Sequence, residues 1–322
     1  MSRQERIEKV SSIKHLILSD SHDFTTDYVT IELEERGLEY LRLDRDLLSK
    51  YQVTWDLDSE TLLVKKFNRE YLIENHTLKS VYYRAPTYLR ETFVRRKSIE
   101  EQVKQSQWMS FYRNLSCFDK AKWMNSPAKT FQAENKIFQL KVARNIGFNI
   151  PKTIIANNAS HIADLNESII VKSIDTAIFD LGDQEGFVYT TPLGRNELVE
   201  EDLSLAPVII QNNLTPKVDF RITVVGNDTY VVKILKNGKG VDGDWRVEKS
   251  NVKYEPAEIP ATIAEMCKSL MSALGLSFGA IDLIFSENQY YFVEINPTGE
   301  WAWLVDAAGF NIYKSICDFL IN

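Results

Sequence analysis

The chain has 322 residues and a formal net charge of −7, with 44% hydrophobic and 26% charged residues. These values are typical of a globular protein and exclude a disordered chain, and the length predicts two or three domains. The mild acidity argues against nucleic acid as the main partner, because phosphate binding favours clustered lysine and arginine.

Targeting and redox signals are absent from the sequence. No stretch approaches the roughly 18 uninterrupted apolar residues of a membrane span, and the charged first residues are unlike a secretory signal. The three cysteines form no C-x-x-C pair, which argues against a disulfide framework or a zinc knuckle. We therefore expect a cytoplasmic protein with no membrane partner. Its histidines are few and scattered, so carboxylates, lysines and arginines are the better candidates for catalysis.

The first region opens with a strand-helix-strand pattern. Ile13–Ser19 is predicted to be a buried strand, Thr25–Gly37 a helix that Gly37 ends, and Leu38–Leu43 a second strand. Such an opening predicts a small parallel sheet. A hairpin, another strand and a long polar helix are expected next, at Gln52–Leu57, Thr61–Phe67, Ser80–Arg84 and Glu91–Leu115. We place a domain boundary at residue 120.

The rest of the chain mixes strands and helices. A helix over Ala133–Gly147 is predicted to end at Gly147, with Pro151 just beyond. The strands expected up to residue 212 are Lys152–Ala156, Ser168–Lys172, Phe187–Thr191 and Val208–Gln211. The last region, 213–322, is expected to hold the strands Asp219–Val225, Tyr230–Lys236, Phe278–Phe285 and Tyr290–Asn296, and the helices Pro260–Leu274 and Asn311–Leu320.

One glycine motif is rejected. Gly238, Gly240 and Gly243 fit the G-x-G-x-x-G pattern of dinucleotide-binding proteins. That pattern must open a helix, so that phosphate meets the helix N-terminus. The residues after Gly243 do not read as a helix start, so we predict a loop between strands.

Three polar residues stand inside the two apolar strands near the C-terminus. Glu294 and Asn296 are two apart and share a face, since side chains alternate along a strand. Asp282 joins them if a three-residue loop links the strands, whereas a two-residue loop would put it on the other face. The three together would suit Mg²⁺. The alternative is a set of solvated residues on an edge hairpin, but carboxylates in such apolar strands need a partner.

Two lysines and two arginines are candidates for binding phosphate. Lys172 closes a buried strand and Lys136 opens a helix, and an ammonium in either place can meet a phosphate. Arg221 could hold a phosphate or a carboxylate, and Arg246 could clamp a phosphate. Taken singly, each of the four is weak evidence, because most lysines and arginines are surface charges or form surface ion pairs.

A possible nucleotide-binding segment follows the strand at Val208–Gln211. Gln211, Asn212 and Leu214 end an apolar strand whose backbone could pair with an adenine edge, and Asp219 could hold ribose hydroxyls. The alternative for these residues is an ordinary strand end followed by a surface ion pair.

In this order, these elements resemble the ATP-grasp ligases over nearly the whole chain. The resemblance implies an α+β fold with a pre-ATP-grasp α/β domain, 1–120, and two α+β lobes, 121–212 and 213–322, that clamp ATP. It implies that Lys136 and Lys172 bind phosphate, that Gln211, Asn212 and Leu214 form the adenine hinge, and that Asp219 binds ribose. It further implies that Asp282, Glu294 and Asn296 hold Mg²⁺, with Arg221 and Arg246 as catalytic residues.

Within that superfamily the sequence most resembles the microviridin-type, or graspetide, peptide maturases. The segments that carry this likeness are Val81–Arg84 with Pro86, Lys122–Pro127, Ala133–Leu140, Asn149–Thr153, Asp219–Gly226, Asp244–Arg246, Glu294–Pro297 and Gly299–Leu304. The likeness implies a ribosomal precursor peptide, with leader and core, as the partner. Asp or Glu side chains of that peptide would be activated as acyl phosphates and closed into ω-ester or ω-amide macrocycles.

Two departures from the relatives are visible. Residues 173–186, after Lys172, replace the glycine- and serine-rich loop of many small-molecule ligases with a partly apolar segment, which we interpret as a hairpin or lid. In the peptide-maturase relatives such a hairpin helps to hold the leader. Ala85 stands where a basic residue is expected after Arg84.

Two alternatives stay open at this point. The first is a ligase that adds glutamate or another amino acid to a protein tail or a small acid. The second is an inactive ATP-grasp-like scaffold that binds nucleotide or peptide without chemistry. The oligomeric state is also open, with a homodimer among the alternatives.

Overall fold

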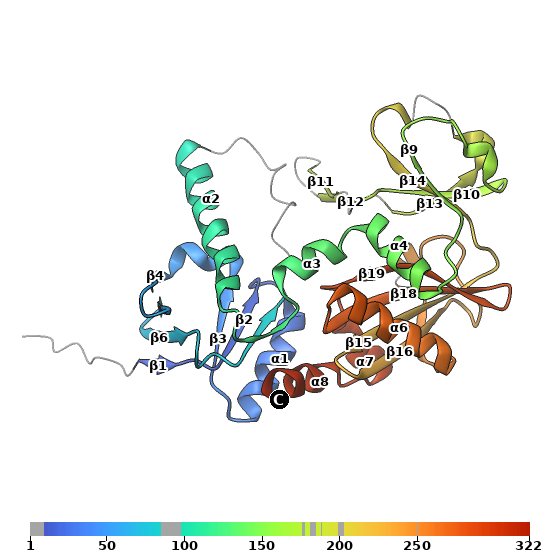
Figure 1. The fold of residues 1–322 in the computed structure, drawn as a ribbon. Helices are drawn as coiled ribbons and strands as arrows, with labels where there is room; N and C mark the ends of the chain where they lie inside the picture. The colour runs from blue at the N-terminus through green and yellow to red at the C-terminus, as the bar shows by residue number, and fades with distance from the viewer. Residues whose placement is uncertain are drawn as a thin grey trace, which may run out of the picture. The chain divides into compact units, whose positions relative to one another are not determined.

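The computed structural model describes residues 10–84, 98–175, 178–180, 185–187, 189–198, 203–248 and 250–322. The chain divides into two compact units (Figure 1). The first unit holds the described residues within 1–89 and 95–128 together with 311–322, and the second unit holds those within 129–310. The C-terminal helix therefore belongs with the start of the chain. Among the described residues, no helix has the length and apolar character that crossing a membrane requires.

The first unit is built on the predicted parallel sheet. Its strands, in the order β3-β2-β7-β8, are Tyr40–Asp44, His15–Ser19, Ser80–Tyr83 and Lys122–Met124. A second sheet has the order β1-β6-β5-β4, with strands Ser11–Ser12, Arg69–Glu74, Thr61–Lys66 and Gln52–Asp56. The helices of this unit are α1 (Phe24–Glu35), α2 (Ile99–Asn114) and α8 (Ile312–Ile321), with short 3₁₀ turns at Arg45–Lys50 and Leu115–Cys117.

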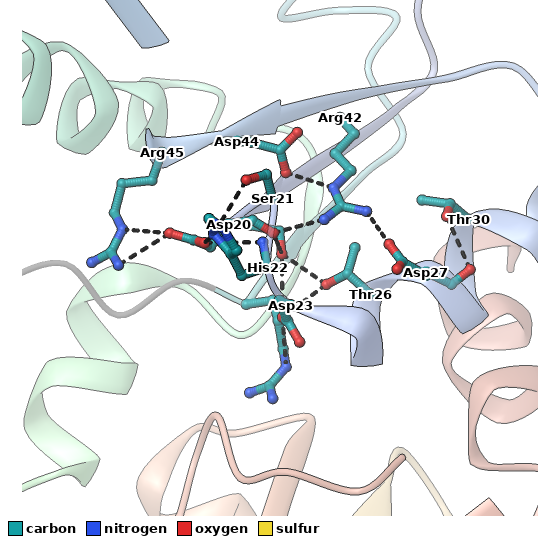
Figure 2. Close-up of polar contacts among 12 residues, drawn as sticks. Asp20, Ser21, His22, Asp23, Thr26, Asp27, Thr30, Arg42, Asp44 and Arg45 are labelled. Atoms are coloured by element: carbon teal, nitrogen blue, oxygen red, sulfur yellow. Dashed lines mark hydrogen bonds and ion pairs between the residues drawn. The ribbon is translucent and has the colours of Figure 1, made fainter. Parts of the chain in front are cut away.

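A polar network lies where β2 and β3 of the first unit end (Figure 2). Arg42 donates to the carboxylates of Asp44 at 2.6 Å and Asp27 at 2.5 Å, and to the Asp20 carbonyl at 2.7 Å. Arg45 lies 3.2 Å from the Asp20 carboxylate. Because the carboxyl ends of parallel strands meet at one edge of a sheet, the topology gathers these charges into one place.

The second unit contains two main sheets. The smaller, in the order β13-β10-β14-β9, is formed by Thr191–Gly194, Ser168–Lys172, Val208–Asn212 and Thr153–Ala156. The larger, in the order β17-β16-β15-β18-β19, is formed by Lys253–Pro256, Asp228–Leu235, Val218–Val225, Phe278–Ser286 and Gln289–Asn296. Its helices include α4 (Lys136–Ile146), α6 (Ala261–Leu274) and α7 (Trp303–Ala308), with 3₁₀ turns at Ile162–Asp164, Arg195–Glu197 and Trp245–Glu248. The helix α3 (Pro127–Ala133) leads into this unit.

The two faces of the five-stranded sheet have different chemistry. Along β15, Phe220, Ile222 and Val224 enter the core that α4 and α6 cover. The alternate residues, Asp219 and Arg221 among them, therefore face the other way. Four side chains of α6 are buried in the same core, Cys267, Leu270, Met271 and Leu274. Each fully buried side chain of this kind stabilises the fold by about 1.5–3 kcal/mol. Packing thus fixes one face and leaves the other for polar groups.

Most of the predicted elements are present, with corrections at particular places. The strand predicted at Phe187–Thr191 is wrong, because Glu185–Phe187 (β12) pairs with Ile178–Asp180 (β11) while β13 pairs with β10. Pro192 is tolerated in β13 because that strand lies at the sheet edge. The hairpin predicted after Lys172 is confirmed in β11 and β12. Pro86, Ala85 and the start of the helix predicted from Glu91 lie outside the described residues.

Several elements were not predicted. The strands β1 and β8 have two and three residues and the helices α3 and α7 seven and six, so their hydrophobic pattern is too short to be recognised. The strands β6 and β17 were also missed, although β6 is as long as the predicted strand β5. The rejected glycine motif does lie in a loop between β16 and β17, as predicted. The helix predicted up to Gly147 ends there with φ of +110°, a conformation that glycine adopts without strain.

Candidate active site

The turn between β18 and β19 has two residues. Ser286 pairs with Gln289, so Glu287 and Asn288 form the turn, with φ of 50° and 60°. Positive φ at both central residues is the signature of a tight type I′ hairpin. With this turn alone, Asp282 would pair with Val293 and lie on the opposite face from Glu294.

A β-bulge restores the alignment. Leu283 pairs with Phe292, whereas Asp282 pairs with Glu294, so Val293 is the extra residue. A bulge shifts the register by one and returns the following side chains to the other face. The two carboxylates therefore lie opposite each other on the polar face of the sheet.

Arginines meet these carboxylates. Arg221 pairs with Asp282 across β15 and β18, and its Nη1 lies 3.2 Å from Asp282 Oδ1. Arg246, on the loop before β17, places Nη2 at 2.9 Å from both Asp282 Oδ2 and Glu294 Oε1. Asn296 Nδ2 donates to Glu294 Oε1 at 3.2 Å. The site thus brings together both predicted catalytic arginines and all three predicted metal ligands.

Burial and charge perturb the two carboxyl groups in opposite directions. Burial raises the pKa of Asp282, although Arg221 and Arg246 oppose that effect. Burial alone would also raise the pKa of Glu294, but Arg246, Lys136 and Lys172 together outweigh it and lower that pKa. Carboxyl groups with perturbed pKa values in a cleft are candidates for a functional site.

Both predicted lysines lie beside the carboxylates. Lys136, the first residue of α4, has Nζ 3.8 Å from Glu294 Oε2 and 3.5 Å from the Ser173 carbonyl. Lys172, the last residue of β10, is only 7% exposed. Burial lowers the pKa of Lys172 to about 8, although Glu294 opposes that effect. A buried ammonium of this kind is well suited to a phosphate.

A pocket joins the candidate nucleotide residues to this cluster. It is lined by residues of both sheets, including Lys172, Gln211, Asn212, Leu214, Asp219, Arg246 and Asp282. Gln211 is buried and donates to Thr153 Oγ1 at 2.8 Å, while the Asn212 side chain accepts from the Asn166 amide at 2.9 Å. These bonds hold β14 in place and leave its end beside the pocket.

Asp219 has a partner that the sequence analysis missed. Lys217 Nζ lies 2.7 Å from Asp219 Oδ1 and 2.5 Å from Oδ2, and both residues line the pocket. Burial raises the pKa of Asp219, although Lys217 opposes that effect. Asp244 was also missed as a site residue, and its Oδ1 accepts from the Arg246 amide at 3.0 Å. In both cases the charged partner stands two residues away in the sequence: Lys217 from Asp219, and Asp244 from Arg246. That spacing of opposite charges was the signal available in the sequence.

The donor set fits Mg²⁺ and a nucleotide. Within the described part of the chain, Asp282 Oδ1 makes no hydrogen bond, although Arg221 lies near it. Carboxylate oxygens beside an amide are ligands that Mg²⁺ accepts, with its other positions left to water and phosphate. Four cationic side chains, those of Lys136, Lys172, Arg221 and Arg246, interact with these carboxylates, and such side chains form strong hydrogen bonds with phosphate.

Comparisons with known proteins agree with this fold and site. No protein-family model matches the chain, and a search of curated proteins gives no match. Among solved structures, the RiPP-associated ATP-grasp ligase of Chryseobacterium gregarium, in complex with ADP and a leader and core peptide, is 26% identical. Its TM-score is 0.82, over 97% of this chain and 97% of that one.

Two further structures are similar. Macrocyclase MdnC of Microcystis aeruginosa MRC, bound with precursor peptide MdnA, is 24% identical with a TM-score of 0.80, over 96% of this chain and 99% of that one. The ATP-grasp ligase PsnB, complexed with minimal precursor, Mg and ADP, is 19% identical with a TM-score of 0.74, over 96% and 97%. The chain therefore has the ATP-grasp fold and matches the graspetide-type ATP-grasp ligases in structure over nearly its whole length.

Proposed function

We propose that the chain is an ATP-dependent carboxylate ligase that forms ω-ester or ω-amide cross-links within a ribosomally made precursor peptide. The observation that carries this proposal is the convergence of Asp282 and Glu294 on Arg246, with Lys136 beside them and Lys172 in the adjoining pocket. The similar ligases in complex with precursor peptides, ADP and Mg support it.

The first step in this proposal is a phosphoryl transfer. A carboxylate oxygen of the peptide attacks the γ-phosphorus of ATP, ADP leaves, and an acyl phosphate forms. Such a reaction depends mainly on positioning and on neutralising charge. Lys136 and Lys172 would neutralise the phosphates of ATP, and Arg221 and Arg246 the transferred group. Mg²⁺, held by Asp282, Glu294 and Asn296, would supply further positive charge at the phosphate oxygens.

The nucleotide itself would be held by the pocket. The backbone at Gln211, Asn212 and Leu214 would meet the adenine edge, and Asp219 would accept from the ribose hydroxyls, as it accepts from Lys217 in this structure. Lys217 would then have to move or share Asp219 with the ribose.

The second step joins the two parts of the peptide. A hydroxyl or amine of the same peptide attacks the acyl carbon, loses its proton and expels phosphate. The acyl phosphate is already activated, so the attack needs no strong base. Each cross-link removes one water from the peptide, with ATP converted to ADP and phosphate.

The intact mass of a candidate precursor peptide after incubation with the protein, Mg²⁺ and ATP tests this function. Loss of one or more waters is the expected result. A gain of amino-acid mass, when free amino acid is supplied, would contradict cyclisation and favour a tail ligase. An unchanged peptide with intact nucleotide binding would favour the scaffold.

The cytoplasmic location, the homodimer and the division at residues 120 and 212 stay predictions.

A further inference from the structure

The strand that carries Glu294 and Asn296 lies at an edge of its sheet. β19 is the last strand in the order β17-β16-β15-β18-β19, so among the described residues no further strand pairs with its outer side, where Asn149 forms an isolated bridge with Tyr291. An edge strand presents N–H and C=O groups that the sheet does not satisfy. Ile295 lies between the two candidate metal ligands. Its backbone N–H and C=O are both on that side.

Gln139 of α4 satisfies both groups of Ile295. Its Oε1 accepts from the Ile295 amide at 3.0 Å, and its Nε2 donates to the Ile295 carbonyl at 2.8 Å. The same Nε2 donates to the Ala133 carbonyl at 2.6 Å. Gln139 is 2% exposed, so its amide has no competing water. For one residue of β19, the side chain takes the place of a neighbouring strand.

Gln139 thus clamps the segment Glu294–Asn296, and this segment is the part of β19 that most needs support. After the bulge at Val293, three residue pairs remain in the register, those of Glu294, Ile295 and Asn296 with β18. A slip of one residue there would turn both candidate ligands to the opposite face. A bidentate bond to the residue between them opposes such a slip.

Gln139 also links the carboxylates to a phosphate-binding lysine. Lys136 lies one turn earlier on α4, and its Nζ is 3.8 Å from Glu294 Oε2. The clamp therefore fixes the start of α4 against the segment that carries Glu294. We propose that Gln139 is a positioning residue that holds Glu294 and Asn296 in register for Mg²⁺ and at a fixed distance from Lys136. This inference rests on the function proposed above.

The test is a Gln139→Met variant, which keeps the length of the side chain and removes its amide. The readout is ADP binding by calorimetry over a range of Mg²⁺ concentrations, which needs no peptide. We expect the Mg²⁺ concentration for half-maximal ADP binding to rise about tenfold, the lower end of the loss usual for outer-shell partners, because Gln139 supports the backbone between the ligands and not a ligand itself. Hydrogen exchange at residues 293–296 should become faster in the same variant.

Asn149→Ala is the matched control. The Asn149 side chain bonds to the same strand before the bulge, with Nδ2 3.1 Å from Gln289 Oε1 and 3.5 Å from the Tyr290 carbonyl. Its loss should leave the Mg²⁺ dependence unchanged. An equal effect of both substitutions would overturn the proposal, because it would reflect a general weakening of the edge.

The remaining outcomes separate this inference from the proposed function. A folded Gln139→Met protein with wild-type Mg²⁺ dependence would overturn the clamp alone, provided that Glu294→Gln loses Mg²⁺-dependent ADP binding. If Glu294→Gln binds as the wild type does, the metal site and the clamp both fail. Should Gln139→Met not fold, Gln139→Asn keeps the amide but shortens its reach, and it is held to the same two readouts.

Discussion

Each compact unit holds a network of arginines and carboxylates, at the ends of β2 and β3 in the first unit and on the polar face of the five-stranded sheet in the second. In the first unit, Arg45 meets Asp20, whose side chain is 22% exposed, and Asp27 is 53% exposed. In the second unit, Arg246 meets Asp282 and Glu294, at 11% and 15%. Asp44 of the first network is 7% exposed and so as buried as these two, and water therefore screens the first set of charges mainly at Asp20 and Asp27.

We propose that the first network supports the fold and that the second is held ready for a ligand. In the second unit burial and neighbouring charges push two carboxyl pKa values apart, and a buried lysine lies in the adjoining pocket. In the first network, Arg42 instead bonds to Asp44, Asp27 and the Asp20 carbonyl. The predictions below test this contrast, from the largest expected effect to the smallest.

The largest effect is expected at the candidate metal ligands. Asp282→Asn or Glu294→Gln should abolish ATP turnover while the fold stays intact, because each removes a charge that the metal requires. The comparison in the first unit is Asp46, whose carboxylate accepts from the Ser21 amide and hydroxyl, and Asp46→Asn should leave ADP affinity, measured by calorimetry, unchanged. Turnover assays, with circular dichroism to check the fold, measure these effects. Normal turnover in both site variants would refute the metal assignment.

A second prediction compares two lysines whose pKa burial lowers, Lys172 and Lys66. Lys172→Ala should weaken ATP binding roughly tenfold to hundredfold, since a charge-assisted bond to phosphate is lost. Lys66→Ala removes a bond of 2.7 Å to the Arg42 carbonyl in the first unit and should leave ATP affinity unchanged. Calorimetry measures the ATP affinity of each variant. Equal ATP affinity of Lys172→Ala and the wild type would contradict the phosphate-binding role of Lys172.

The arginines provide a third comparison, in stability without ligands. Arg246→Gln leaves two buried carboxylates facing each other and should cost about 3 kcal/mol of unfolding free energy. Arg45→Gln should cost less than about 1 kcal/mol, because its partner is more exposed. Urea unfolding measures the free energy of unfolding of both variants. Added Mg²⁺ should raise that free energy more in the Arg246 variant than in the Arg45 variant. Equal costs would remove the distinction between the networks.

The smallest effect concerns His15 in β2, whose Nδ1 lies 2.8 Å from Ser80 Oγ. Burial lowers its pKa, and Lys79 and Lys14 add to that effect. In the unfolded chain this histidine therefore binds a proton near pH 6.5, whereas in the folded chain it binds the proton only at a lower pH. Stability from this group is complete above that pH and is lost as pH falls toward the lowered pKa. Thermal unfolding of the wild type and His15→Gln from pH 7.5 to 5.5 should show a steeper loss in the wild type.

Much of the site could be predicted from the sequence, because it depends on local periodicity. The spacing of Glu294 and Asn296 placed them on one face, and Gly147 marked the end of α4. The position of Asp282 could not be settled, since the bulge at Val293 leaves no signal in an apolar run. The contact of Gln139 with Ile295 joins residues 156 positions apart, and only the packing of α4 brings them together. Long-range partners of this kind lie beyond what periodicity predicts.

The most direct test of the account is where a metal binds. Crystals grown with ADP and Mn²⁺, which favours the same oxygen ligands as Mg²⁺, would locate it by anomalous scattering. We predict a peak between Asp282 and Glu294, with Arg246 moved off the carboxylates. A different place is available in the first unit, where ligand atoms of Asp20, His22 and Asp46 lie within 4.8 Å of one another. A peak there alone, with Arg246 still bound to both carboxylates, would contradict the account.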